Sequence, residues 1–347
     1  MAAFVAPETY RPRNTHIFSG KGDYLGGAYI NSPAQIRKDD FHSMCDSFLM
    51  FPGKPHVRWS LHHLKDDNEV GDLVSRTSDD ITPDRYIILG PQSDVVDVQL
   101  STQPAIRRAP SAQVVEVDDT GKSMRTNQAH FRNGVLNRDN ETCTITGWKG
   151  ETTNQATHIF PVSKVKLWDD EGYARWITDT NSPRTIGPSK LFSMQNGLLL
   201  CLNVHILFDL FVLAINPDRG YRIVYFEQDE NGIGGGTLNP STRDCSDPNN
   251  RVSDECLRWH FHQAVLTNMR GVGERPWDLN PDEEGDLGLM MEKENASEIL
   301  EEVFADRLGA FIQADEDEGE DHNHDHDHDA DDNADYDGYH DDDDDAQ

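Results

Sequence analysis

The chain has 347 residues, of which 36% are apolar, and a formal net charge of −32. Between Asp315 and Gln347 there are 18 acidic residues and no Lys or Arg, so the residues before Asp315 carry a net charge of −14. This acidic balance excludes a protein that coats DNA through bulk positive charge. The sequence has no run of about 18 apolar residues, which excludes a membrane-spanning protein.

Cysteine usage and the first residues indicate a reducing compartment. The five cysteines are an odd number and are thinly spread along the chain. The first residues lack the long apolar core of a secretory signal peptide. A secreted disulfide scaffold is therefore not expected, and we expect an intracellular protein, with nucleus and cytoplasm not distinguished.

Residues 1–125 are expected to form a β-rich region, and the sequence indicates no role for it. Short apolar or alternating runs are separated by turn residues such as Gly90 and Pro91, a pattern typical of short strands. The runs are 56–61, 86–89, 95–100 and 114–117. Because no helical period is visible in this region, no helix is expected there.

The segment 126–240 is expected to alternate short helices and strands. Its apolar runs are brief, and turn residues such as Gly147, Pro161 and Gly197 lie between them. The expected helices are 131–138 and 204–209, and the expected strands are 143–147, 156–161, 198–202, 211–215 and 221–226. The last two strands flank an Asn-Pro-Asp-Arg-Gly turn and should form a hairpin.

Residues 241–313 are expected to form a helical segment that packs on the preceding one. Ser253 can cap a helix that runs to about residue 269. Apolar residues recur on one face of that helix, at Leu257, Phe261, Val265 and Met269. A second helix is expected over 296–311. The Asp/His-rich residues 314–347 cannot bury apolar surface and are expected to be disordered.

Four polar residues between 138 and 209 have spacings suited to a cation and a base. His205 and Asp209 are four apart on an expected helix, so that they share a face and can hold one divalent cation. His158 ends an expected strand, and a neutral imidazole can take a proton from water. Asn196 can hydrogen-bond both the backbone and an imidazole.

The order of His158, Asn196 and His205 resembles the His–Asn–His (HNH) endonuclease motif, including the eight residues between the asparagine and the last histidine. The flanks are similar to the HNH domain of many fungal proteins of unassigned role, and the resemblance covers about residues 128–275. The flanking matches include Phe131, Arg132, Asn137, Arg138, Asp139, Cys143, Thr144, Gly147, Ala156, Ile159, Phe160, Pro161, Gly197, Ile206, Phe208, Leu257, Trp259, His260, Asn268 and Gly271.

The resemblance implies a ββα-metal fold and metal-assisted hydrolysis of DNA phosphodiester bonds. In this family His158 matches the general base, Asn196 the orienting asparagine and His205 the metal-ligand histidine. Asp209 lies where some members have another ligand, although it could instead pair locally at the helix end. The cation could be Mg, Mn or Zn.

Two departures from the family pattern affect metal binding. Many members have a metal-binding Asp or His directly before the base, where this chain has Thr157, a poor ligand. Members with a structural zinc have two CxxC pairs. Here Thr146 and Val204 stand where the second cysteine of each pair would be, three residues after Cys143 and Cys201. We therefore expect no structural zinc, and a cation held by His205, Asp209, water and substrate.

Further features concern partners. Lys164, Lys166 and Lys190 lie near the expected site and could contact DNA phosphates, although neighbouring acids make a merely solvated surface an equal alternative. The acidic tail could imitate DNA or bind basic proteins such as histones. Its alternating histidines could bind divalent metals loosely.

These expectations combine into an α+β protein: a β-rich region, a ββα-metal HNH domain, a helical segment and a disordered acidic tail. The favoured function is a divalent-metal-dependent endonuclease that acts on DNA. The alternative is a non-catalytic HNH-fold binding module whose acidic tail engages histones or other basic partners.

Overall fold

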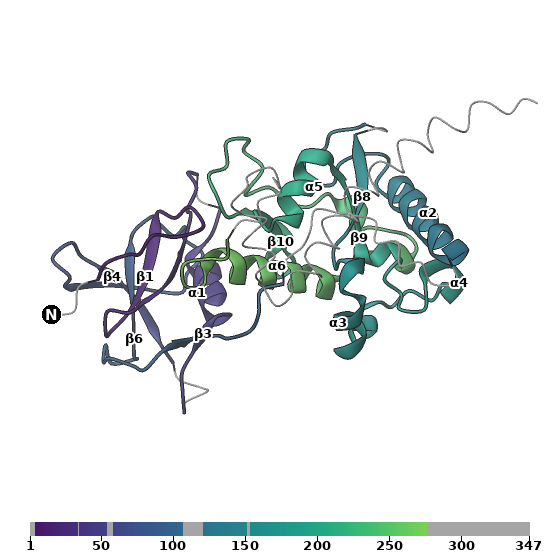
Figure 1. Cartoon of the computed structure of the whole chain (residues 1–347). Helices are drawn as coiled ribbons and strands as arrows, with labels where there is room; N and C mark the ends of the chain where they lie inside the picture. Colours follow the sequence, from purple (N-terminus) through teal and green to yellow (C-terminus); the bar gives the residue numbers. More distant parts are fainter. Residues whose placement is uncertain (1–3, 34, 54–57, 107–120, 151–152, 276–347) are drawn as a thin grey trace, which may run out of the picture.

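The computed structural model describes residues 4–33, 35–53, 58–106, 121–150 and 153–275 (Figure 1). Three expectations therefore lie outside the described residues: the strand 114–117, the helix 296–311 and the disordered tail 314–347.

A five-stranded sheet forms most of the N-terminal region, at the purple end of the chain in Figure 1. Its strand order is β2-β1-β6-β4-β5, and all neighbours are antiparallel except β1 and β6. The strands are β1 (Thr15–Ser19), β2 (Tyr24–Ala28), β4 (Ser60–Leu64), β5 (Val70–Val74) and β6 (Arg85–Leu89). The short strands β3 (Leu49–Met50) and β7 (Gln99–Leu100) form a separate pair.

This region also contains a helix, α1 (Lys38–Asp46), so the expectation of no helix before residue 125 was wrong. Phe41, Met44, Cys45 and Phe48 are buried and recur at helical spacing. The helix has only nine residues, and its apolar stripe is too short to stand out against the alternating runs around it. A helix this short is not stable alone, so α1 is stabilised by the packing of its apolar stripe against the sheet.

The central part of the chain builds two strands and a helix around which the other elements pack (Figure 1). Strand β8 (Asn154–His158) pairs antiparallel with β9 (Gly197–Cys201), and helix α5 (Leu202–Asp209) follows β9 directly. Helix α2 (Gly121–Arg138) lies along the strand pair. Short helices fill the connection between β8 and β9, namely η1 (Val162–Lys164), α3 (Val165–Asp170), η2 (Tyr173–Trp176), α4 (Pro183–Ile186) and η3 (Met194–Asn196).

The expected strand 143–147 is instead a turn. Cys143 N–H donates to Trp148 O, and Gly147 N–H donates to Cys143 O, so the segment closes on itself. Gly147 has φ +74°, in the left-handed region that glycine adopts easily. Thr144 N–H donates to Leu199 O at 2.8 Å and fixes the turn to β9. The β-branched residues here therefore support a turn rather than a strand.

The expected hairpin and capped helix are both confirmed. Strands β10 (Leu213–Asn216) and β11 (Arg222–Tyr225) are antiparallel around the predicted turn. Helix α6 (Asp254–Met269) begins after Ser253, whose side chain accepts the Cys256 N–H. The helix is buried on more than the one predicted face, because Trp259, His260 and Gln263 are buried as well.

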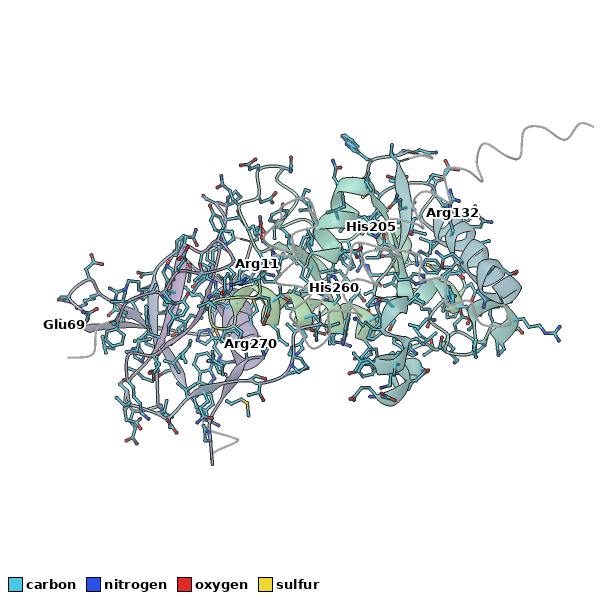
Figure 2. The ribbon with its side chains drawn as sticks, in the orientation of Figure 1. Arg11, Glu69, Arg132, His205, His260 and Arg270 are labelled. Carbon is cyan, nitrogen blue, oxygen red and sulfur yellow. The ribbon has the colours of Figure 1, made fainter. Side chains whose placement is uncertain are left out.

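Helix α6 joins the two halves of the molecule. Its C-terminal residues Ala264, Val265, Leu266 and Met269 share one core with α1 and the N-terminal sheet, whereas Leu257 and Trp259 share another with β9 and α5. At the boundary, Arg11 pairs with Glu227 at 3.0 Å. Figure 2 shows Arg11 and Arg270 at this boundary and His260 on the middle of α6. Among the described residues, no helix is both long and apolar enough to cross a membrane.

Candidate functional site

The end of β8 is held against α2 by aromatic packing on His158. The imidazole stacks on the Phe131 ring, with centroids 3.8 Å apart and planes 8° apart. The Phe192 ring meets it edge-on at 5.6 Å. Gly197, which pairs with His158 in the sheet, makes this approach possible, since a Cβ there would lie 2.6 Å from Phe131. The ring plane of His158 is therefore fixed before any substrate binds.

Asn196 hydrogen-bonds two backbone segments near the site, the residues that follow β8 and those that precede η3. It is fully buried at the end of η3, and its side-chain oxygen accepts the Phe160 N–H at 2.8 Å. Its side-chain nitrogen donates to Phe160 O and Leu191 O at 3.0 and 3.1 Å. The contact with His158 Nδ1 is longer, at 3.5 Å. Asn196 thus positions His158 mainly by fixing the backbone that follows it.

His205 and Asp209 form a buried pair on α5, where Figure 2 labels His205. Their Nε2 and Oδ2 atoms are 3.2 Å apart, and their side chains are 7% and 1% exposed. On the other side of the ring, His205 Nδ1 lies 2.7 Å from Oε1 of Gln155, which belongs to β8. Gln155 therefore links the strand to the helix through the imidazole of His205.

The Gln155 contact determines what the pair can hold. An amide oxygen only accepts, so Nδ1 of His205 carries a proton, and the neutral ring has its lone pair on Nε2. That lone pair then faces a carboxylate oxygen. Two acceptors 3.2 Å apart in a buried site repel each other unless a positive charge lies between them. A proton or a cation between Nε2 of His205 and Oδ2 of Asp209 therefore stabilises the pair.

The 3.2 Å between the two atoms is the spacing of a direct ion pair at i and i+4, and it is also that of two ligands on one metal ion. Ligands about 2.1 Å from a cation, at angles of about 90–110°, lie about 3.0–3.4 Å apart. Gln155 fixes the imidazole from behind, as partners of metal-bound histidines commonly do. No cluster of three or more His, Cys, Asp and Glu side chains suited to a metal is found in the described part of the chain. Water and substrate would complete the coordination.

Thr157, where the resemblance places a further ligand, is turned to the backbone. It is 1% exposed, and its hydroxyl donates to Gln155 O at 3.4 Å. Strand alternation puts Thr157 and Gln155 on one face of β8 and His158 on the other. Gln155 and His158 are three residues apart, or about 10 Å along an extended strand. The His158 side chain and the Gln155 contact with His205 therefore lie on opposite faces of β8.

The three lysines differ in their surroundings. Lys190 donates from Nζ to Ile177 O at 3.2 Å and to Asp179 O at 3.4 Å, so its ammonium is used within the fold. Lys164 is half-buried at the end of η1, and Lys166 is exposed on α3. Phosphate contact stays a prediction for all three.

A buried ion pair that the sequence did not indicate joins the elements around the site. Arg138 and Asp139 meet at 2.6 Å, with side chains 2% and 0% exposed. Arg138 also donates to Met194 O and Gly197 O, and Asp139 accepts from Leu199 N–H. The end of α2 is thereby tied to η3 and β9. An Arg at the end of the expected helix, followed directly by an Asp, was the available signal.

Gln155 and Phe131 were not assigned roles from the sequence either. Neither carries chemistry of its own, and each contributes only because the fold places it against an imidazole. Phe131 was a matching flank of the motif, but a buried phenylalanine is usually a core residue. Gln155 stands three residues before His158 on a strand of five, a position that no spacing rule marks.

Comparison with known proteins identifies this part of the chain. Residues 143–216 match the family model described as HNH endonuclease, a segment that includes β8, β9 and α5. A solved structure, "Modification dependent TagI restriction endonuclease", is 20% identical over 38% of this chain and 36% of its own, with a TM-score of 0.24. The alignment thus spans about a third of that enzyme. None of the curated proteins compared with the chain matches it.

Proposed function

We propose that this protein, through its HNH domain over residues 143–216, is a divalent-metal-dependent endonuclease that hydrolyses DNA phosphodiester bonds. The observation that carries the proposal is the buried pair of His205 and Asp209, with Nε2 and Oδ2 3.2 Å apart, on the helix beside the strand that ends in His158. Hydrolysis of a phosphodiester requires a base and a cation at the same phosphate, so the scissile phosphate has to reach both His158 at the end of β8 and the pair on α5.

His158 is the proposed general base. Its stacking on Phe131 and the anchoring of the next residues by Asn196 hold the imidazole in one orientation. A fixed, neutral imidazole can take the proton of an attacking water molecule without reorganising. Asn196 is a positioning residue in this account.

His205 and Asp209 are the proposed cation ligands, with Gln155 orienting the imidazole of His205. A bound divalent cation would stabilise the charge that develops on the phosphate and on the leaving oxygen. With two protein ligands, affinity should be modest and should increase when DNA is bound. Lys164 and Lys166 are proposed to contact neighbouring phosphates.

The proposal is tested by a nicking assay on supercoiled plasmid DNA with Mg²⁺ or Mn²⁺, beside a chelator control. Wild-type protein should nick only with the metal present. His158→Ala should lower the rate by about 10²–10⁴-fold, the usual contribution of a general base. His130→Ala, which changes an exposed histidine on α2, should leave the rate unchanged. Equal nicking by the His158→Ala protein would contradict the assignment of the base.

A second candidate is a non-catalytic module that binds DNA or a protein through the same fold. Two observations favour it: Thr157 offers its hydroxyl to the backbone, and apolar side chains are exposed beside the site. The exposed side chains are Trp148, Leu202 and Ile206. The module would bind DNA with a metal present and leave it uncut at every metal concentration, which the same assay detects.

A further inference from the structure

Two of the five free cysteines meet where the turn after α2 docks on the start of α5. Cys143 is fully buried in the turn, and Cys201 is the half-buried last residue of β9. Thr144 in the same turn donates from N–H and from its hydroxyl to Leu199 O on β9. These hydrogen bonds fix the turn and the strand end at a constant distance.

Thr146 lies against both sulfur atoms. Its backbone N–H donates to Cys143 Sγ at 3.4 Å, and its hydroxyl oxygen lies 3.9 Å from Cys201 Sγ. The two thiols also interact with each other: burial raises the pKa of Cys201, and the neighbouring Cys143 thiol raises it further. Both sulfurs therefore lie against the same residue, Thr146, and the two thiols are close enough to interact with each other.

The geometry points to a redox pair: we propose that Cys143 and Cys201 close to an intramolecular disulfide when a disulfide oxidant such as oxidised glutathione is present. The Cys201 thiolate attacks one sulfur of the oxidant, forms a mixed disulfide and releases one reduced glutathione. The Cys143 thiolate then attacks Cys201 Sγ and releases the second. Each protein thiol loses its proton to solvent as its thiolate forms.

The other three cysteines have different surroundings. Cys45 is fully buried in the N-terminal core, and burial raises its pKa well above the usual range. Cys256 is fully buried on α6, and burial raises its pKa to about 12. Cys245 donates its thiol hydrogen to Ser241 O at 3.1 Å. Within the pair, Cys143 is fully buried and Cys201 is half-buried, so Cys201 is the thiol expected to react first.

Closure would tie the turn covalently to the end of β9, directly before α5. The helix begins at Leu202, directly after Cys201, and has His205 and Asp209 along its length. The disulfide would restrain the unfolded chain between residues 143 and 201, and the midpoint of thermal unfolding should therefore rise on oxidation. This inference concerns the thiols alone and does not rest on the proposed nuclease function.

The test uses the full-length protein incubated with oxidised glutathione at neutral and at mildly alkaline pH. Intact mass under non-reducing conditions should fall by two hydrogen atoms, and peptide mapping should recover one cross-linked species containing Cys143 and Cys201. Dithiothreitol should reverse both changes. The rate should rise with pH, because the raised pKa of Cys201 limits its thiolate near neutrality.

Variants separate the two steps. Cys143→Ser should stop the reaction at a glutathione adduct on Cys201, because the resolving thiol is gone. Cys245→Ser is the matched control and should form the disulfide as the wild type does. A stable glutathione adduct on the wild-type protein, an unchanged mass, or a cross-link to any other cysteine would each overturn the proposal.

Discussion

Asn196 contributes to the site as a structural anchor, and this role can be measured without any substrate. Its buried side chain makes three hydrogen bonds to the backbone, to Phe160 twice and to Leu191 once. Asn196→Ala should lower the free energy of unfolding by at least about 1–3 kcal/mol, the cost of one buried polar group left without a partner. Chemical denaturation followed by circular dichroism measures this change.

Asn203→Ala is the matched control, since Asn203 is exposed on α5. Its effect on unfolding should stay within about 0.5 kcal/mol, as is usual for surface positions. If the Asn196 and Asn203 variants unfolded alike, Asn196 would not be the anchor that its contacts indicate.

Among the elements, the contact between β8 and α5 should set the affinity of the proposed cation site. Gln155→Ala removes the acceptor that holds His205 Nδ1 and leaves both proposed ligands in place. The affinity for Mn²⁺ should fall by about 10- to 100-fold, as is usual when the partner of a metal-bound histidine is lost. His205→Ala should reduce binding further.

Isothermal titration of the full-length variants measures these affinities, and the tail histidines contribute equally to all of them. Asn203→Ala again serves as the control on α5. If Gln155→Ala and His205→Ala both bound Mn²⁺ as the wild type does, the pair of His205 and Asp209 would be a local contact and not a cation site.

For the whole molecule, charge should govern access of DNA. Residues 314–347 contribute −18 of the net −32, and their deletion leaves −14. A tethered polyanion reaches an effective concentration of order millimolar near the body and should compete with DNA for the few basic residues there. Deletion should therefore tighten DNA binding at low salt.

Added salt should shrink that difference, because the Debye length is about 10 Å at 0.1 M and shorter above. Fluorescence anisotropy with labelled DNA, over a series of salt concentrations, measures the affinity of both proteins. Equal affinities at low salt would mean that the tail does not compete with DNA and acts on another partner, such as a basic protein.

Much of the HNH unit could be predicted from the sequence because its signals are local. The strand expected over 198–202 is found at Gly197–Cys201, and the helix expected over 204–209 is found at Leu202–Asp209. The spacing of four residues between His205 and Asp209 places them on one helical face, as expected. Ser253 likewise marks the start of α6 through its own side chain.

The rest depends on contacts between segments far apart in sequence. The turn at 143–147 is fixed by Leu199, and Gln155 gains a role only where α5 brings His205 to it. Helix α1 is too short to stand out by periodicity and is stabilised by the sheet against which it packs. No local pattern encodes such pairings.

The most direct test of the account is the single-turnover rate of DNA cleavage as a function of Mn²⁺ concentration, for wild type, His158→Ala and His205→Ala. We predict that His158→Ala lowers the maximal rate and leaves the half-saturating Mn²⁺ concentration unchanged, because the base is not a ligand. His205→Ala should raise the half-saturating concentration. A shift in half-saturation with His158→Ala, or unaltered curves for both variants, would contradict the separate roles assigned to the base and to the cation pair.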